Sequence, residues 1–147
     1  MGPPTRVHDG LRIGLDENIC LYIKCLMLIE KVLEWSGAAR RDLKDFPVGV
    51  RRAVGYALGV AQMGGKHPAA KPWKGEGAGV FEVVESDEGN AYRAVYTVRF
   101  AKAVYVLHCF QKKSPSGIRT SKGDVDLIHQ RLRAAKQHYV ENYDQES

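Results

Sequence analysis

Residues 80–112, VFEVVESDEGNAYRAVYTVRFAKAVYVLHCFQK, decide the fold. Three runs rich in β-branched and aromatic residues lie at 80–85, 91–100 and 103–112, a composition typical of strands. The turn sequence DEGN joins the first run to the second, and a two-residue connection joins the second to the third. Because connections this short join antiparallel neighbours, the stretch predicts an antiparallel meander.

Strict alternation along the last two runs predicts which side chains share a face of this sheet. The middle run places Tyr92 and Tyr96 on one face and Arg93 on the other, so one side of the sheet is expected to be buried and the other polar. The last run assigns one face to Val104, Val106, His108, Phe110 and Lys112. Its other face receives Tyr105, Leu107, Cys109 and Gln111.

Shorter elements precede the meander. Residues 32–35 predict a strand, and Ser36 is a suitable cap for a short helix over 38–45. A longer helix is predicted over 47–63, where apolar residues recur at helical spacing after a proline that a first turn tolerates. Its buried stripe is expected to contain Val50, Val54, Ala57, Leu58 and Ala61. Prolines and glycines in residues 66–79 predict a loop.

A final helix is predicted after Ser121, which forms a capping pattern with Asp124. The helix is expected to end near Val140, with a buried stripe of Val125, Ile128, Leu132, Ala135 and Tyr139. The predicted order is therefore β-α-α-β-β-β-α, a small α+β domain over residues 31–140.

The two ends of the chain are expected to lie outside this domain. Residues 1–30 are read as an N-terminal extension, which is either poorly ordered sequence upstream of a natural start at Met27 or a genuine helix packed on the domain. Residues 141–147 form an acidic tail.

Composition fits one globular domain, since 147 residues are 44% hydrophobic and 27% charged. A net charge of +5 favours an anionic partner, and residues 111–140 alone carry seven basic and two acidic residues. The cysteines, Cys20, Cys25 and Cys109, match no zinc pattern and predict reduced thiols in the cytoplasm. The apolar run at 19–29 is too short to span a bilayer, so no membrane association is expected.

The sequence carries no P-loop, GxGxxG, HExxH or GxSxG signature. Its five histidines lack ligand spacing, so neither a metal site nor a cofactor is expected. His108 and Cys109 are adjacent on a strand and should point to opposite faces, which argues against a nucleophile–base pair. The remaining candidates are cations interleaved with aromatic residues, a pattern that can hold a nucleic-acid backbone and stack bases. They are Lys71, Lys74, Arg93, Arg99, Lys112, Lys113 and Arg119, with Trp73, Tyr92, Tyr96 and Phe110 among them.

Several of these residues also have a purely structural explanation. Arg93 can pair with Glu82 across the sheet, an interaction worth up to ~1 kcal/mol. The lysines that end the last strand can simply solvate it. His108 on an apolar face is more often packed than catalytic, and Trp73 is better explained as a core side chain than as a stacking platform.

Five segments of the sequence occur in a recognisable order. They are AQMGGKHPAAKPWKG at 61–75, GVFEVVE at 79–85, YRAVYTVRF at 92–100, VYVLHCFQKKS at 104–114 and RTSKGDVDLIHQRL at 119–132. Over about residues 31–140 the chain resembles the phage-derived branch of the RelE/ParE toxin superfamily, the HigB-like toxins of type II toxin–antitoxin systems. The resemblance implies a RelE-like fold, with an antiparallel sheet flanked by helices, which agrees with the predicted order of elements.

The resemblance also implies an activity and partners. Proteins of this kind are ribosome-dependent mRNA endoribonucleases in which the ribose 2′-hydroxyl attacks the adjacent phosphate without a metal. The product ends in a cyclic or 3′-phosphate. A helix-turn-helix antitoxin from the neighbouring gene binds and neutralises the toxin.

Matching the motifs assigns roles to individual residues. Arg93 would contact the scissile phosphate, and Lys112 and Lys113 would stabilise phosphate charge. His108 is the candidate general base, because histidine titrates near neutral pH. The expected RNA-binding residues are Lys71, Lys74, Arg99, Phe110 and Arg119.

Two alternatives remain open at this stage. A ParE-like relative would poison DNA gyrase through protein contact and leave mRNA intact. A prophage remnant would keep the fold and have no activity.

Overall fold

The computed structural model describes residues 30–112 and 120–143. The chain divides into two units, residues 1–30 and 31–147, and the described helices and strands belong to the second. The expectations for residues 1–29, Lys113, Arg119 and the last four residues lie outside the described part.

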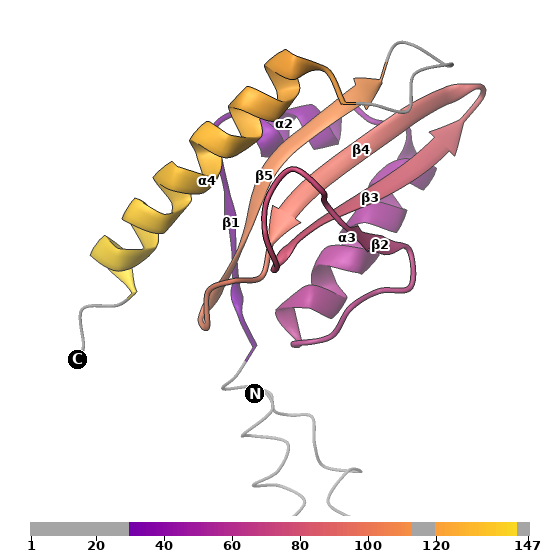
Figure 1. Cartoon of the computed structure of the whole chain (residues 1–147). Helices are drawn as coiled ribbons and strands as arrows, with labels where there is room; N and C mark the ends of the chain where they lie inside the picture. Colours follow the sequence, from indigo (N-terminus) through magenta and orange to yellow (C-terminus); the bar gives the residue numbers. More distant parts are fainter. Residues whose placement is uncertain (1–29, 113–119, 144–147) are drawn as a thin grey trace, which may run out of the picture. The chain divides into compact units, whose positions relative to one another are not determined.

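The domain is a five-stranded sheet with helices on both faces (Figure 1). Its elements are β1 (Val32–Trp35), α2 (Ala39–Lys44), α3 (Val48–Gln62), β2 (Ala70–Pro72), β3 (Val80–Asp87), β4 (Asn90–Thr97), β5 (Ala103–Lys112) and α4 (Lys122–Asn142). The strand order is β1-β5-β4-β3-β2, in which β1 is parallel to β5 and the other pairs are antiparallel. The α+β prediction is confirmed.

The outer edge and the covering of the sheet differ from the sequence-based expectation. Residues 70–72 form β2 inside the segment predicted as a loop, because Ala70 fits into the core opposite Val83 and Pro72 stands at the outer edge of the sheet, where a missing N–H is tolerated. The expected polar face is also covered in part, since α4 packs on it while α2 and α3 cover the other face.

The helices follow their predicted stripes closely. All five residues predicted to face inward from α3 are buried, and Pro47 occupies its N-cap position. In α4, Ile128, Leu132, Ala135 and Tyr139 are buried and Ser121 accepts the N-cap hydrogen bond from the Asp124 N–H. The predicted Ser36 cap is wrong: α2 begins after Ala38, and no side chain caps it.

A β-bulge changes the faces of β5. Val95 pairs with His108 but Tyr96 pairs with Val106, so Leu107 is an extra residue without a partner in β4. From this point on, the alternation is shifted by one. Val104 and Val106 therefore share the α3 side with Cys109, whereas His108, Phe110 and Lys112 lie on the α4 side with Tyr105 and Leu107. The predicted faces of β5 are wrong beyond the bulge for this reason.

Candidate functional site

The sheet face on the α4 side carries rows of cross-strand neighbours, whose side chains emerge together. Lys71, Glu82, Val95 and His108 form one row across β2 to β5. Val84, Arg93 and Phe110 form the next row, and Ser86, Ala91 and Lys112 form the third. We use the term basic patch for Lys71, Glu82, Arg93, Phe110 and Lys112. None of these five side chains is fully buried.

Arg93 and Glu82 form the ion pair at the centre of the basic patch. Arg93 Nη1 donates to Glu82 Oε1 at 2.7 Å, and the two side chains are only 12% and 16% exposed. The pair that the sequence predicted is therefore present. It holds the guanidinium in one orientation on the sheet, which is what a phosphate ligand requires.

Lys112 is the second cation of the basic patch, one row beyond Arg93. Its Nζ is shielded from solvent and has no hydrogen-bond partner among the described residues. Burial lowers the pKa of Lys112, the Arg93 charge lowers it further, and Glu82 acts in the opposite direction. An amine in this position loses its proton more readily than an exposed lysine.

His108 joins the basic patch to the start of α4. Its Nε2–H donates to Asp124 Oδ1 at 2.7 Å, and its ring stacks on Phe110 with centroids 4.5 Å apart. Arg131 Nη1 donates to the Leu107 carbonyl at 2.8 Å and lies 3.5 Å from His108 Nδ1. Both ring nitrogens thus face protein groups, and the residue is 6% exposed.

Gly37 leaves space for Arg131, because a Cβ at Gly37 would lie 2.6 Å from Arg131 Nη2. The residue also has a φ of 53°. We expect Gly37→Ala to lower the free energy of unfolding by about 1–3 kcal/mol, from backbone strain and the weakened Arg131 hydrogen bond. When Arg131 is replaced by Gln, only the backbone strain of Gly37→Ala should remain. Urea unfolding of the two single variants and the double variant should therefore show a coupling free energy of about 1 kcal/mol between the two positions. Strict additivity would contradict the proposed contact.

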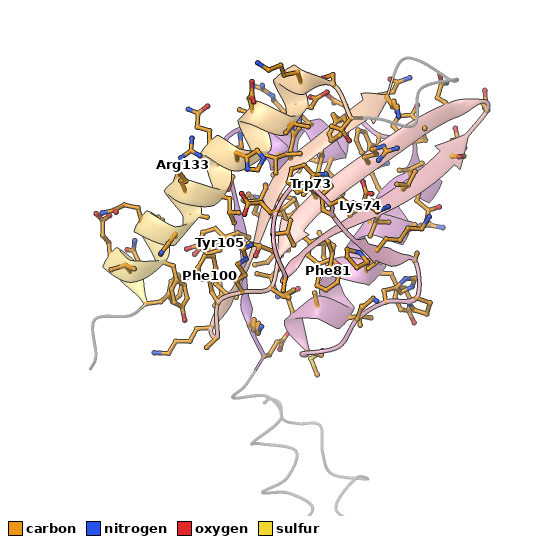
Figure 2. All side chains as sticks on the ribbon, viewed as in Figure 1. Trp73, Lys74, Phe81, Phe100, Tyr105 and Arg133 are labelled. Carbon is orange, nitrogen blue, oxygen red and sulfur yellow. The ribbon has the colours of Figure 1, made fainter. Side chains whose placement is uncertain are left out.

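The segment after β2 folds over the sheet next to the basic patch. Trp73, labelled in Figure 2, is buried with Val80 and Val95. Its ring lies 5.5 Å from that of His129 on α4. The expectation of a core role for Trp73 is confirmed. Glu76 continues this connection, since its carboxylate accepts from His129 Nδ1 at 2.6 Å and from Arg99 Nη2 at 3.4 Å.

Glu76 should make the stability of this segment pH-dependent. Burial alone would raise the pKa of Glu76, but His129 and Arg99 outweigh it and hold the pKa below the ordinary 4.5. Such a carboxylate stabilises the fold above its unfolded-state pKa, and this contribution is lost as pH falls through the folded value. The difference in unfolding free energy between wild type and Glu76→Gln, measured in urea, should therefore narrow as the pH falls below about 4.5. A difference in unfolding free energy that does not change with pH would contradict this assignment.

The structure brings together some of the predicted site residues and separates others. Arg93, Lys112, Phe110 and Lys71 lie in the basic patch, and Lys74 is exposed in the segment after β2. Arg99 instead anchors that segment, with Nε donating to the Ala78 carbonyl at 2.8 Å. Sequence reasoning missed four residues that shape the site: Asp124, Arg131, Glu76 and His129. Of these, only Asp124 gave a signal, through its capping pattern.

Other candidate groups do not form a reactive centre. Burial raises the pKa of the Cys109 thiol to about 12, and the thiol lies on the face opposite His108. Within residues 30–112 and 120–143, no three His, Cys, Asp or Glu side chains are grouped as metal ligands would be. No helix in the same described ranges has both the length and the apolar character needed to cross a bilayer.

Comparison with known proteins identifies the family. The model of the phage-derived protein Gp49-like family (DUF891) matches residues 41–133, which is more than half of the chain and includes the whole basic patch. Searches of curated proteins and of solved structures gave no match. The expected phage-derived family is thus confirmed at this coarser level, and the chain belongs to the phage-derived Gp49-like proteins.

Proposed function

We propose that the chain is a toxin of the RelE/HigB type and acts as a ribosome-dependent, metal-independent mRNA endoribonuclease in the cytoplasm. Its partners in this proposal are the translating ribosome, mRNA and a helix-turn-helix antitoxin. The observation that supports it most strongly is the juxtaposition of Arg93 and Lys112 in the basic patch, with Glu82 as the only carboxylate of that patch. Membership of a phage-derived family is compatible with this role.

Arg93 is suited to hold the scissile phosphate. Attack of the ribose 2′-oxygen on phosphorus builds negative charge on the non-bridging oxygens, and a preorganised guanidinium stabilises that charge. Glu82 occupies Nη1, so the fork is already oriented before RNA binds. In our proposal the guanidinium contacts the phosphate in this same orientation.

Lys112 is suited to act as the general base that accepts the 2′-hydroxyl proton. Its lowered pKa eases loss of the amine proton, and the neutral amine can accept the 2′-hydroxyl proton as the new P–O2′ bond forms. The P–O5′ bond then breaks, and the leaving 5′-oxygen takes a proton from the protonated amine or from water. The products are a 2′,3′-cyclic phosphate and a 5′-hydroxyl.

His108 receives a different role in this proposal from that of a general base. Both ring nitrogens face Asp124 and Arg131, and the ring is nearly buried, so no nitrogen is presented to a substrate hydroxyl. The geometry supports a positioning residue that holds Phe110 beside Arg93. The half-buried Phe110 ring can then stack on a base next to the cleaved phosphate.

The remaining cations suit the RNA backbone outside the reactive centre. Lys71, at the edge of the basic patch, and Lys74, in the segment after β2, are exposed and can contact phosphates away from the reacting groups. The same backbone-binding role is proposed for Lys113 and Arg119. Arg99 is better assigned to the anchor that holds Glu76.

Controlled expression without any antitoxin tests this function. Growth arrest accompanied by new mRNA 5′ ends inside translated messages is the expected result. Arrest with intact mRNA and damaged DNA would contradict it and favour the gyrase-poisoning alternative. Normal growth with soluble protein present would favour an inactive remnant.

A further inference from the structure

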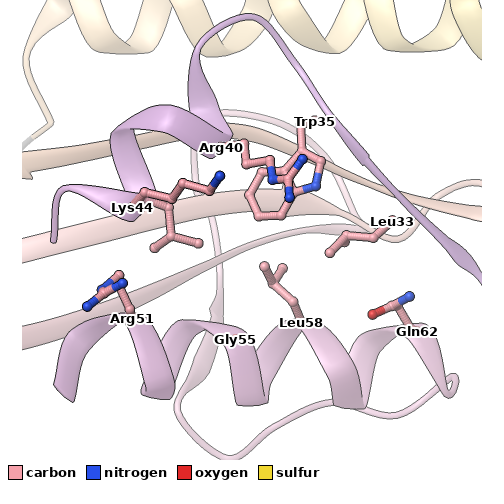
Figure 3. Close-up of a pocket in the computed structure, with 9 residues that line it drawn as sticks. Leu33, Trp35, Arg40, Lys44, Arg51, Gly55, Leu58 and Gln62 are labelled. Carbon is pink, nitrogen blue, oxygen red and sulfur yellow. The ribbon is translucent and has the colours of Figure 1, made fainter. Parts of the chain in front are cut away.

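A second surface lies on the other side of the sheet, around a pocket of about 270 Å³ between β1, α2 and α3 (Figure 3). Its walls are apolar, formed by Leu33, Trp35, Leu43 and Leu58. This pocket belongs to the α3 side of the domain, whereas the basic patch lies on the α4 side. The two surfaces therefore lie on opposite sides of the sheet.

The rim of the pocket is strongly positive. Arg40, Lys44 and Arg51 line it and are exposed. No ion pair joins any of the three to a carboxylate in the described part of the chain. An occupant with an apolar side chain and adjacent acidic groups would match both the wall and the rim.

The outer surface of α3 continues this pocket as an unusually open helix face. Val48 and Met63 on that face are 56% and 54% exposed, a high value for large apolar side chains. Gly55 and Gly59 lie between them, one turn apart, and a Cβ built at either would have no neighbour within 4 Å. Glycine disfavours helix, and no contact among the described residues requires it at these two positions, but it lets another backbone approach closely.

We propose that the pocket and the outer face of α3 dock an amphipathic helix of a partner protein, with an apolar stripe flanked by Asp or Glu. One apolar side chain of that helix enters the pocket, and its acidic residues pair with Arg40, Lys44 and Arg51. A second copy of this chain fits less well, because a symmetric contact would place the same cations opposite one another. This inference does not depend on ribonuclease activity.

A peptide probe tests the docking surface with the full chain. The probe is a fluorescein-labelled synthetic helix with Leu and Ala along one stripe and Glu on both flanks, compared with the same peptide carrying Lys in place of Glu. Fluorescence anisotropy should show the Glu peptide binding about tenfold more tightly or better. Equal affinities would overturn the proposal.

Adjacent arginines provide a matched pair of protein variants. Arg40 lines the pocket, whereas Arg41 is exposed on the same helix and does not. Arg40→Glu should weaken binding of the Glu peptide about fivefold or more, and Arg41→Glu by less than about twofold. Equal losses would mean that net charge alone attracts the peptide, and would overturn the site.

Substitutions at two glycines of α3 distinguish an effect on peptide docking from an effect on helix stability. Gly55→Leu should raise the melting temperature and yet weaken peptide binding about tenfold, since leucine favours helix but fills the approach. Gly49 lies about a quarter turn from this face, and a Cβ there would have no neighbour within 4 Å. Gly49→Leu should therefore raise the melting temperature without loss of peptide binding. If Gly55→Leu still bound the peptide as tightly as wild type, the proposed close approach of the partner helix to α3 would be wrong. Sedimentation would show whether the free chain self-associates. Self-association that is abolished by Arg40→Glu would assign the surface to a second copy of the chain instead.

Discussion

Arg93→Gln is expected to lower the rate of mRNA cleavage by about 10²–10³-fold, the usual effect of removing one group that stabilises transition-state charge. Glutamine can still hydrogen-bond Glu82 but brings no positive charge to the phosphate. The loss should appear in single-turnover cleavage of ribosome-bound mRNA. Binding of the protein to the ribosome should change far less, because other cations hold the RNA backbone.

Arg52→Gln is the matched control, since Arg52 is exposed on α3 away from the basic patch. It removes the same charge from the chain and should leave cleavage unchanged. The variant Arg93→Gln must also be folded, and its loss of a largely buried ion pair should cost about 1–3 kcal/mol of unfolding free energy. If folded Arg93→Gln and Arg52→Gln cleaved mRNA equally fast, Arg93 would have no role in the reaction.

Lys112→Met is expected to abolish cleavage while stabilising the fold at neutral pH. Methionine has a similar length and no charge to desolvate, whereas the amine of Lys112 is shielded and close to Arg93. The melting temperature at pH 7 should therefore rise. A residue that lowers the stability of the fold is typical of a functional site.

The pH dependence of this gain follows from the direction of the pKa shift. Folding lowers the pKa of Lys112 from its usual 10.5, so the charged amine destabilises the fold, and this effect disappears as pH rises toward that value. The advantage of Lys112→Met over wild type should be largest near neutrality and shrink in alkaline buffer. Lys122→Met, on an exposed side chain of α4, is the control for a simple change of residue type. A Lys112→Met protein less stable than wild type would contradict the desolvation argument.

Most of the fold could be predicted from local patterns. The predicted limits of β5 match the structure, because a run rich in β-branched and aromatic residues follows a short connection. The strand β2 could not be, because three residues including Pro72 carry almost no strand signal and depend on pairing with β3. The parallel pairing of β1 with β5 likewise depends on tertiary structure that a four-residue strand does not reveal.

The site was predictable only where it follows from one hairpin. Arg93 and Glu82 lie on strands joined by a tight turn, so their proximity could be inferred from alternation alone. The bulge at Leu107 leaves no mark in the sequence, yet it decides on which face His108 lies. The contacts of His108 with Asp124 and Arg131 require that bulge and the crossing of α4 over β5, so they could not be inferred.

The measurement that tests the central claim most directly is analysis of the cleaved RNA ends in a reconstituted translation reaction. Wild-type protein should generate 2′,3′-cyclic phosphate and 5′-hydroxyl ends on translated mRNA, detected by mass spectrometry. The double variant Arg93→Gln/Lys112→Met should generate none, whereas Arg51→Gln/Arg52→Gln, on the opposite side of the sheet, should cleave normally. Undamaged mRNA with wild-type protein, or equal cleavage by both double variants, would contradict the assignment of the basic patch as a ribonuclease site.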